Sequence, residues 1–302
     1  RYHDDVGHLV GSGPVARVLS DHGLNPDRIA GLIAGEGKFG QLVSGELDVD
    51  RMDYLVRDAH HTGVPYGTID HERLVRELRF VDGELVLDEG NVQTAESLLL
   101  ARALMNPTVY QHSVARIAKT TLRRATERLL EATDIDAETL ARMDDHDLRV
   151  ALRQCEATAE AVGRLDTRNL YKRAVWAEMA AVPDHLLEAD HERIREYERD
   201  IAAEAGVEPR AVSLDVPAEP TMRETSSRVV VNGEVRRLSE QSTLVSALRA
   251  AQRDQWRLGV YAPADESERV GNATIRTLGL DLSGALVRDV RPGINATLED
   301  FE

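Results

Sequence analysis

The segment from Gly45 to Gly63 constrains the fold most, because its periodicity predicts a two-faced helix. At about 100° per residue, one face is apolar and consists of Met52, Leu55, Val56 and Ala59. The opposite face is polar and consists of Asp50, Tyr54, Arg57, Asp58 and His61. Carboxylates and an imidazole beside an arginine suit a metal ion and a phosphate ester, whereas a solvated surface is the commoner role of a charged stripe. The spacing alone leaves both interpretations open.

The composition narrows the class of protein. A formal net charge of −16 over 302 residues argues against general nucleic-acid binding. Three lysines and many acidic residues resemble the proteome of a salt-loving microbe, although a GC-rich genome gives the same bias. Cys155 is the single cysteine, so no internal disulfide is possible. With no apolar run of membrane-span length and no visible secretory leader, we expect a cytoplasmic protein without a membrane partner.

The pattern along the chain predicts a mainly α-helical body with a β-hairpin, followed by a small α+β module at the C-terminus. In the body we expect helices at 26–34, 91–106, 108–131, 136–180 and 187–205, with a hairpin at 78–87 around Asp82-Gly83. In the module we expect strands at 211–216 and 256–261, a hairpin at 228–238 around Asn232-Gly233, and helices at 242–253 and 266–278. The predicted domains are 1–133, 134–206 and 207–302.

The run Asp48-Val-Asp-Arg-Met-Asp-Tyr-Leu-Val-Arg-Asp-Ala-His-His-Thr-Gly63 carries a family resemblance. It resembles the fourth signature of the HD-domain phosphohydrolases, in the branch of the deoxynucleoside triphosphate triphosphohydrolases. The resemblance implies an HD-type helical domain that hydrolyses a dNTP to deoxynucleoside and triphosphate, and residues 1–133 would be its C-terminal part. It also implies a homo-oligomer, a nucleotide substrate and a divalent metal ion, which could be Mn, Mg, Fe, Co, Ni or Zn. The metal would polarise a phosphorus-bound oxygen and lower the pKa of a bound water.

The resemblance assigns roles to residues of the predicted helix. Asp50 would be a catalytic metal ligand, and Asp48 would lie beside the nucleotide. Arg51 would contact phosphate, because the planar guanidinium matches two oxygens at once. Tyr54 would line the sugar pocket, and Asp58 would bind the sugar 3′-hydroxyl.

A second segment, Met105-Asn-Pro-Thr-Val-Tyr-Gln-His112, supports the same family. It resembles the block in which a Tyr-Gln-His run recognises deoxyribose and base. Tyr110 and Gln111 would make these contacts, and Arg102 would reach phosphate from the preceding helix. Family members often carry His where Asn106 stands.

The other metal ligands of the family, an early His and a His-Asp pair, are expected upstream of this chain, which starts at Arg1 and would then be a fragment or a processed product. His3 is placed as a catalytic residue near the pocket, where the family has a His followed by an acidic residue. The alternative is that His3, Asp4 and His8 themselves form the metal motif.

The run Arg168-Asn-Leu-Tyr-Lys172 resembles a block that holds a regulatory nucleotide in activated family members. Arg168 and Lys172 are four residues apart and would share a helix face. Acidic Asp88-Glu89 stands where activated members have basic residues, so a solvated basic pair is the alternative. A further basic series is expected to be a solvated helix face, with a phosphate-facing wall as the alternative: Arg116, Lys119, Arg123, Arg124 and Arg128.

Three functions remain open on the sequence. The first is a metal-dependent dNTP triphosphohydrolase, inactive in this chain if ligands are missing. The second is a nucleotide-binding or interaction module without catalysis. The third is an HD-type hydrolase of another phosphate ester.

Overall fold

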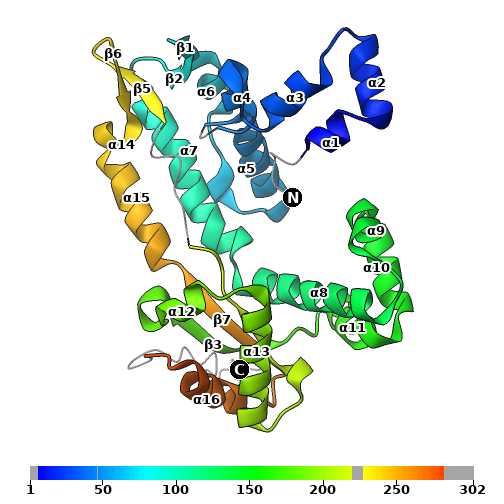
Figure 1. Ribbon diagram of the computed structural model, residues 1–302. Helices are drawn as coiled ribbons and strands as arrows, with labels where there is room; N and C mark the ends of the chain where they lie inside the picture. Colours follow the sequence, from blue (N-terminus) through cyan, green and yellow to red (C-terminus); the bar gives the residue numbers. More distant parts are fainter. Residues whose placement is uncertain (1–5, 46, 220–226, 282–302) are drawn as a thin grey trace, which may run out of the picture. The chain divides into compact units, whose positions relative to one another are not determined.

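The computed structural model describes residues 6–45, 47–219 and 227–281 (Figure 1). The described chain is mainly helical with two small sheets, which confirms the predicted fold class. It forms two compact units. Unit 1 consists of residues 1–109 and 220–253, and unit 2 consists of residues 110–219 and 254–302. No helix in the described ranges combines the length and the apolar character needed to cross a membrane.

Unit 1 is built on a helical layer. Its helices are α1 (Gly7–Val10), α2 (Gly13–Asp21), α3 (Pro26–Ile33), α4 (Gly37–Val43), α5 (Val49–Thr62), α6 (His71–Glu77) and α7 (Val92–Met105). The predicted helix at 26–34 is confirmed as α3, whose first backbone N–H groups donate to the Asn25 side chain. The helices pack through fully buried side chains that include Leu55, Leu74, Leu98 and Met105.

A four-stranded sheet completes unit 1. Its strands are β1 (Leu78–Val81), β2 (Glu84–Leu87), β5 (Arg228–Val231) and β6 (Glu234–Arg237), in the order β1-β2-β5-β6. Both predicted hairpins are confirmed. Asp82 and Gly83 have φ of 51° and 84°, and Asn232 and Gly233 have φ of 52° and 76°. Two consecutive left-handed residues are the conformation that a two-residue hairpin turn requires.

The parallel pairing of β2 with β5 determines how the chain is divided into units. Val86 pairs with Arg228, and Leu87 pairs with Val229. This pairing brings the second hairpin into unit 1 together with α14 (Leu238–Gln241) and most of α15 (Thr243–Asp254). The predicted domains, divided at residues 133 and 206, stay a prediction.

Unit 2 begins at Tyr110, the last residue of a π-helical turn at Asn106–Tyr110. Its helices are α8 (Ser113–Ala132), α9 (Ala137–Arg142), α10 (Asp145–Gln154), α11 (Ala159–Asp166), α12 (Asp184–Leu187), α13 (His191–Ala205) and α16 (Ser267–Leu278). An antiparallel sheet of order β3-β7-β4 joins β3 (Lys172–Glu178), β7 (Arg257–Ala262) and β4 (Ser213–Asp215). Its core packs strand residues such as Val260 and Leu214 against Ile201 of α13 and Val270 of α16. Cys155 packs against a second, smaller cluster.

The predicted helix over 136–180 is wrong in its last part. The last helix in that range, α11, ends at Asp166, Arg168 has a left-handed φ of 56°, and β3 begins at Lys172. Pairing with β7 stabilises the strand, and Val175 and Ala177 alternate into the core. Arg168 and Lys172 consequently do not share a helix face.

The basic series of α8 is not a solvated face throughout. Lys119 and Arg123 are exposed, but Arg116 and Arg124 are buried. The Arg116 Nε atom donates to Asp215 Oδ2 at 2.8 Å, and its Nη1 atom donates to the Arg257 carbonyl at 2.9 Å. The expectation is wrong for these two residues because their carboxylate partners come from β4 and α13, far along the chain.

Candidate functional site

Helix α5 provides most of the predicted site, and its local sequence explains where it starts and stops. Asp48 precedes the first turn and accepts a hydrogen bond from the Arg51 backbone N–H at 2.7 Å, a typical N-cap contact. The helix ends at Gly63, whose φ of 70° is readily accessible to glycine. Met52, Leu55 and Ala59 are buried, so the apolar face packs as predicted.

The Asp48 carboxylate lies in a largely buried, basic environment. Its side chain is 8% exposed, and Arg51 Nη2 lies 3.6 Å from Asp48 Oδ2. Burial raises the pKa of Asp48, while the Arg51 and Arg102 guanidinium groups act in the opposite direction. Burial outweighs these effects, so the pKa of Asp48 stays raised, and its charged form is favoured first by the charge and the backbone N–H of Arg51 and then by the charge of Arg102.

Arg102 reaches this group from α7, which packs against α5. Burial lowers the pKa of Arg102, and the nearby charge of Arg51 acts in the same direction. A side-chain hydrogen bond with Tyr54 and the charge of Asp48 oppose this effect. The structure thus brings together four predicted residues, which we call the arginine cluster: Asp48, Arg51, Tyr54 and Arg102. Two guanidinium groups around one carboxylate suit an incoming oxyanion, because planar N–H donors bind phosphate oxygens in pairs.

The remaining predicted residues of α5 differ in exposure. Asp58 is half-buried, and its spacing places it on the helix face of Arg51 and Tyr54. Asp50 is exposed in the first turn, and its charge contributes to the raised pKa of Asp48. Arg57 is 55% exposed and pairs with Asp53 at 2.9 Å, so it lies outside the arginine cluster.

The other predicted residues lie elsewhere. Tyr110 is half-buried at the end of the π-helical turn and Gln111 is exposed after it, and both belong to unit 2. Their convergence with Tyr54 stays a prediction. Arg168 and Lys172 are exposed. The predicted catalytic residue His3 and its neighbour Asp4 lie outside the described residues.

A metal centre needs several His, Cys, Asp or Glu side chains around one point. Within residues 6–45, 47–219 and 227–281, no group of three or more such residues is placed to hold an ion. The described donor set therefore does not fit a metal centre by itself. Asp50 as a ligand stays a prediction that requires further ligands.

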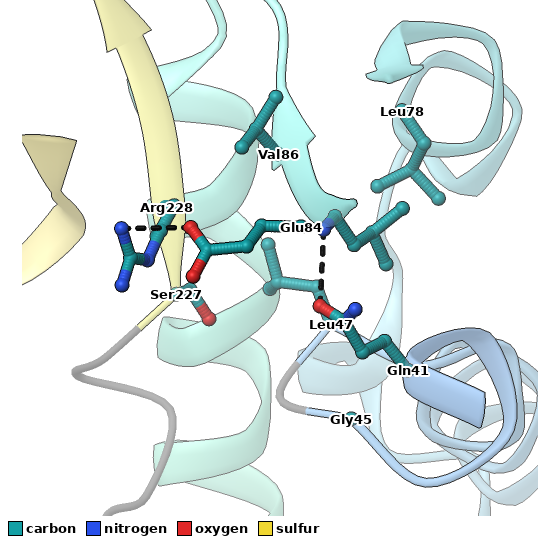
Figure 2. A pocket seen from close by; sticks show the side chains of 9 residues that line it. Gln41, Gly45, Leu47, Leu78, Glu84, Val86, Ser227 and Arg228 are labelled. Carbon is teal, nitrogen blue, oxygen red and sulfur yellow. Dashed lines mark hydrogen bonds and ion pairs between the residues drawn. The ribbon is translucent and has the colours of Figure 1, made fainter. Parts of the chain in front are cut away.

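Sequence reasoning missed a cavity of about 240 Å³ in unit 1 (Figure 2). It lies between the end of α4, the first hairpin and the start of β5, with Leu47, Leu78 and Val86 among its apolar lining. Gln41 bridges to the hairpin by accepting from the Leu85 N–H at 3.0 Å, and Arg228 pairs with Glu84 at 2.7 Å. No local pattern joins Gln41 to Arg228, and none of the predicted site residues lines this cavity.

Comparison with known proteins establishes the family. Residues 69–289 match the model of the HD associated region, and the chain belongs to that family. It is 32% identical over 246 residues to an uncharacterised protein of Methanocaldococcus jannaschii, covering 78% of this chain and 53% of the relative. It is 26% identical over 299 residues to the uncharacterised protein YwfO of Bacillus subtilis, covering 87% of this chain and 67% of the relative. The chain thus spans about half the length of the archaeal relative.

Solved structures share the fold. A hypothetical protein from Aquifex aeolicus superposes with a TM-score of 0.68 at 23% identity, covering 88% of this chain and 70% of that protein. A phosphohydrolase from Bacteroides thetaiotaomicron superposes with a TM-score of 0.56 at 22% identity, covering 86% and 79%. These likenesses show a shared fold, and the family match to the HD associated region agrees with the coarser sequence expectation of a relation to HD-domain proteins.

Proposed function

We propose that this protein is an HD-type phosphohydrolase whose arginine cluster binds the phosphate group of its substrate. The observation that carries the proposal is the meeting of Arg51 and Arg102 beside Asp48 on packed helices. In a partly desolvated site, each charge-assisted hydrogen bond to phosphate is stronger than at the surface. The Tyr54 hydroxyl positions Arg102 through their shared hydrogen bond.

The finer proposal is that the substrate is a dNTP. Water attacks the α-phosphorus, the bond to the 5′ oxygen breaks, and that oxygen takes up a proton, which releases deoxynucleoside and triphosphate. Arg51 and Arg102 bind the negative oxygens, and Asp58 binds the 3′-hydroxyl. The resemblance supports a divalent metal with Asp50 as a ligand and His3 as a proton donor, and all three stay proposals for the whole protein.

Titration of the purified protein with dATP by calorimetry tests phosphate binding. Arg102→Gln removes a cationic donor from the arginine cluster, so we expect the dissociation constant to rise about tenfold or more, since a hydrogen bond to a charged group contributes about 1.5–3 kcal/mol. Arg57→Gln is the matched control on exposed α5 surface and should change the constant less than about twofold. Equal effects of the two substitutions would contradict the assignment.

Substrate class is tested with a second variant. Asp58→Ala removes the proposed partner of the 3′-hydroxyl, so dNTP hydrolysis should fall much more than hydrolysis of bis(p-nitrophenyl) phosphate, which has no sugar. Equal losses would favour hydrolysis of another phosphate ester. Nucleotide binding by the full-length protein without turnover under any divalent metal would favour the non-catalytic alternative.

A further inference from the structure

A second group of arginines lies in unit 2, where α8, α11 and the segment before β4 come together. The side chains of Arg124, Arg128, Arg164 and Arg210 line one small cavity, together with Tyr171 and Ser213. Arg124 and Arg128 belong to the basic series of α8 for which the sequence left a phosphate-facing surface as the alternative. All lining residues belong to unit 2, whereas the arginine cluster belongs to unit 1. The cavity therefore needs an explanation of its own.

Arg124 is the buried arginine of this cavity. Its side chain is 5% exposed; Nη1 contacts both Glu127 carboxylate oxygens at 3.0 Å, and Nη2 contacts Glu198 Oε1 at 2.5 Å. Its Nε atom is buried and has no hydrogen-bond partner among the described residues. A buried N–H without an acceptor is costly, by about 1–3 kcal/mol. Arg124 therefore keeps one N–H donor, at Nε, that no described residue uses.

The other arginines leave an excess of positive charge. Glu160 is shared between Arg164, at 3.2 Å, and Arg210, at 3.7 Å. Arg128 forms no ion pair with any residue in the described part of the chain. Because Glu127 and Glu198 are shared by Arg124 and Arg195, Glu160 is the one lining carboxylate that remains for Arg128, Arg164 and Arg210. An anion is the ligand that such a charge balance favours.

Tyr171 lines the cavity and contacts two of its arginines. The Arg164 guanidinium lies 4.9 Å from the centre of the Tyr171 ring, and the Tyr171 hydroxyl donates to the Arg210 carbonyl at 2.9 Å. Burial raises the pKa of Tyr171, and the charges of Arg164, Arg128 and Arg210 oppose that rise. The charges of all three arginines thus reach Tyr171, one of the residues that line the cavity.

The size of the cavity limits the ligand. Its volume of about 20 Å³ admits roughly one oxygen-sized group, since one water needs at least about 10–15 Å³. A nucleoside does not fit, but one oxygen of a phosphate group does. Arg210 is 63% exposed, so its long side chain remains available to bind the outer oxygens.

We propose that this cleft is a phosphate-binding site, in which one oxygen of a phosphate group accepts from Arg124 and the others bind Arg128, Arg164 and Arg210. The phosphate is either a free inorganic ion or the terminal group of a larger molecule that extends into solvent. The proposal stands independently of the function proposed for the arginine cluster.

The test uses inorganic phosphate and the NMR signal of the Arg124 Nε–H group, which reports on this cleft alone. We expect a saturable shift in the native protein. Arg128→Gln and Arg210→Gln should each weaken phosphate binding about tenfold, because each removes a charged donor. Arg142→Gln is the control, since Arg142 pairs with Glu138 on exposed α9 and lines no part of the cleft.

Three outcomes would overturn the proposal. The first is an Arg124 signal that does not change on phosphate addition. The second is phosphate binding by the two cleft variants as tight as that by Arg142→Gln, and the third is a shift caused by acetate, at equal ionic strength, as large as that caused by phosphate. A titration with pyrophosphate distinguishes the two sources: tighter binding than inorganic phosphate supports the terminal group of a larger molecule, and weaker binding supports the free ion.

Discussion

Replacing Glu198 by alanine is expected to destabilise unit 2 strongly. Glu198 lies on α13 with a side chain only 1% exposed. Its carboxylate accepts from Arg124 Nη2 at 2.5 Å, from Arg195 Nη1 at 2.5 Å and from the Leu214 backbone N–H at 2.8 Å. The one group therefore joins α8, α13 and β4.

The magnitude follows from what remains after the substitution. Arg124 stays buried with only Glu127 as its partner, and the Leu214 N–H loses its acceptor. Removing one partner of a buried ion pair costs about 3–5 kcal/mol, and an unsatisfied buried N–H costs about 1–3 kcal/mol. Because Glu127 offsets part of the charge, we expect a loss of about 3 kcal/mol in the free energy of unfolding.

Glu196 provides a matched control on the same helix. It pairs with Arg193 at 2.5 Å with the same three-residue spacing, but the two side chains are 40% and 52% exposed. Exposed ion pairs contribute about 0–1 kcal/mol, so Glu196→Ala should have little effect.

Urea denaturation followed by tryptophan fluorescence measures this difference. The chain has two tryptophans, Trp176 and Trp256, and both lie in unit 2, so the signal reports on that unit. If Glu198→Ala and Glu196→Ala differ by less than about 1 kcal/mol in unfolding free energy, the reasoning about the buried carboxylate is refuted.

Three further predictions concern single groups. Hydrogen bonds from Arg153 and then Arg149 lower the pKa of Asp166 to about 2. The stabilisation that these ion pairs give is therefore present above the ordinary carboxyl pKa and is lost as the pH falls towards 2. An NMR titration of Asp166 that gives an ordinary midpoint would contradict this. Burial and then Asp215 raise the pKa of Tyr261 far above its ordinary value, so the stability that the neutral phenol gives the folded protein is lost as the pH rises above about 10. Because Tyr261 stays neutral while the protein is folded, Tyr261→Phe should leave the ultraviolet phenolate titration of the folded protein unchanged. Gly206 ends α13 with a φ of 66°, and Gly206→Ala should cost about 1–2 kcal/mol in the same urea assay, whereas an unchanged midpoint would argue against the left-handed cap.

The parts of the fold that depend on neighbours in sequence could be predicted. Asp82-Gly83 and Asn232-Gly233 indicate hairpins because few residue types tolerate left-handed backbone, so a pattern of two adjacent residues is enough to predict the turn. The pairing of β2 with β5 could not be predicted, because no local pattern specifies a partner so far along the chain. The strand at Lys172–Glu178 was missed for a related reason, since its pairing with β7 overrides a helix-compatible composition.

The candidate site shows the same limit. The periodicity of α5 predicted its packed face, and the family resemblance indicated Arg51, Tyr54 and Arg102 as separate contacts. The hydrogen bond of Tyr54 with Arg102 depends on how α5 packs against α7, which spacing does not encode. The burial of Arg124 could likewise not be predicted from the sequence, because its partner Glu198 lies on another helix.

The parallel β2–β5 pairing has a consequence for biosynthesis. Strand β2 leaves the ribosome roughly 140 residues before β5, which at about 5–20 residues per second amounts to roughly 7 to 28 seconds. During this interval the backbone N–H and C=O groups at the β2 edge of the hairpin have not yet formed their hydrogen bonds with β5. Unit 1 reaches its final hydrogen-bonded state only after residues 110–219 of unit 2 have been synthesised. The order in which this chain is made is therefore not the order in which its units are completed.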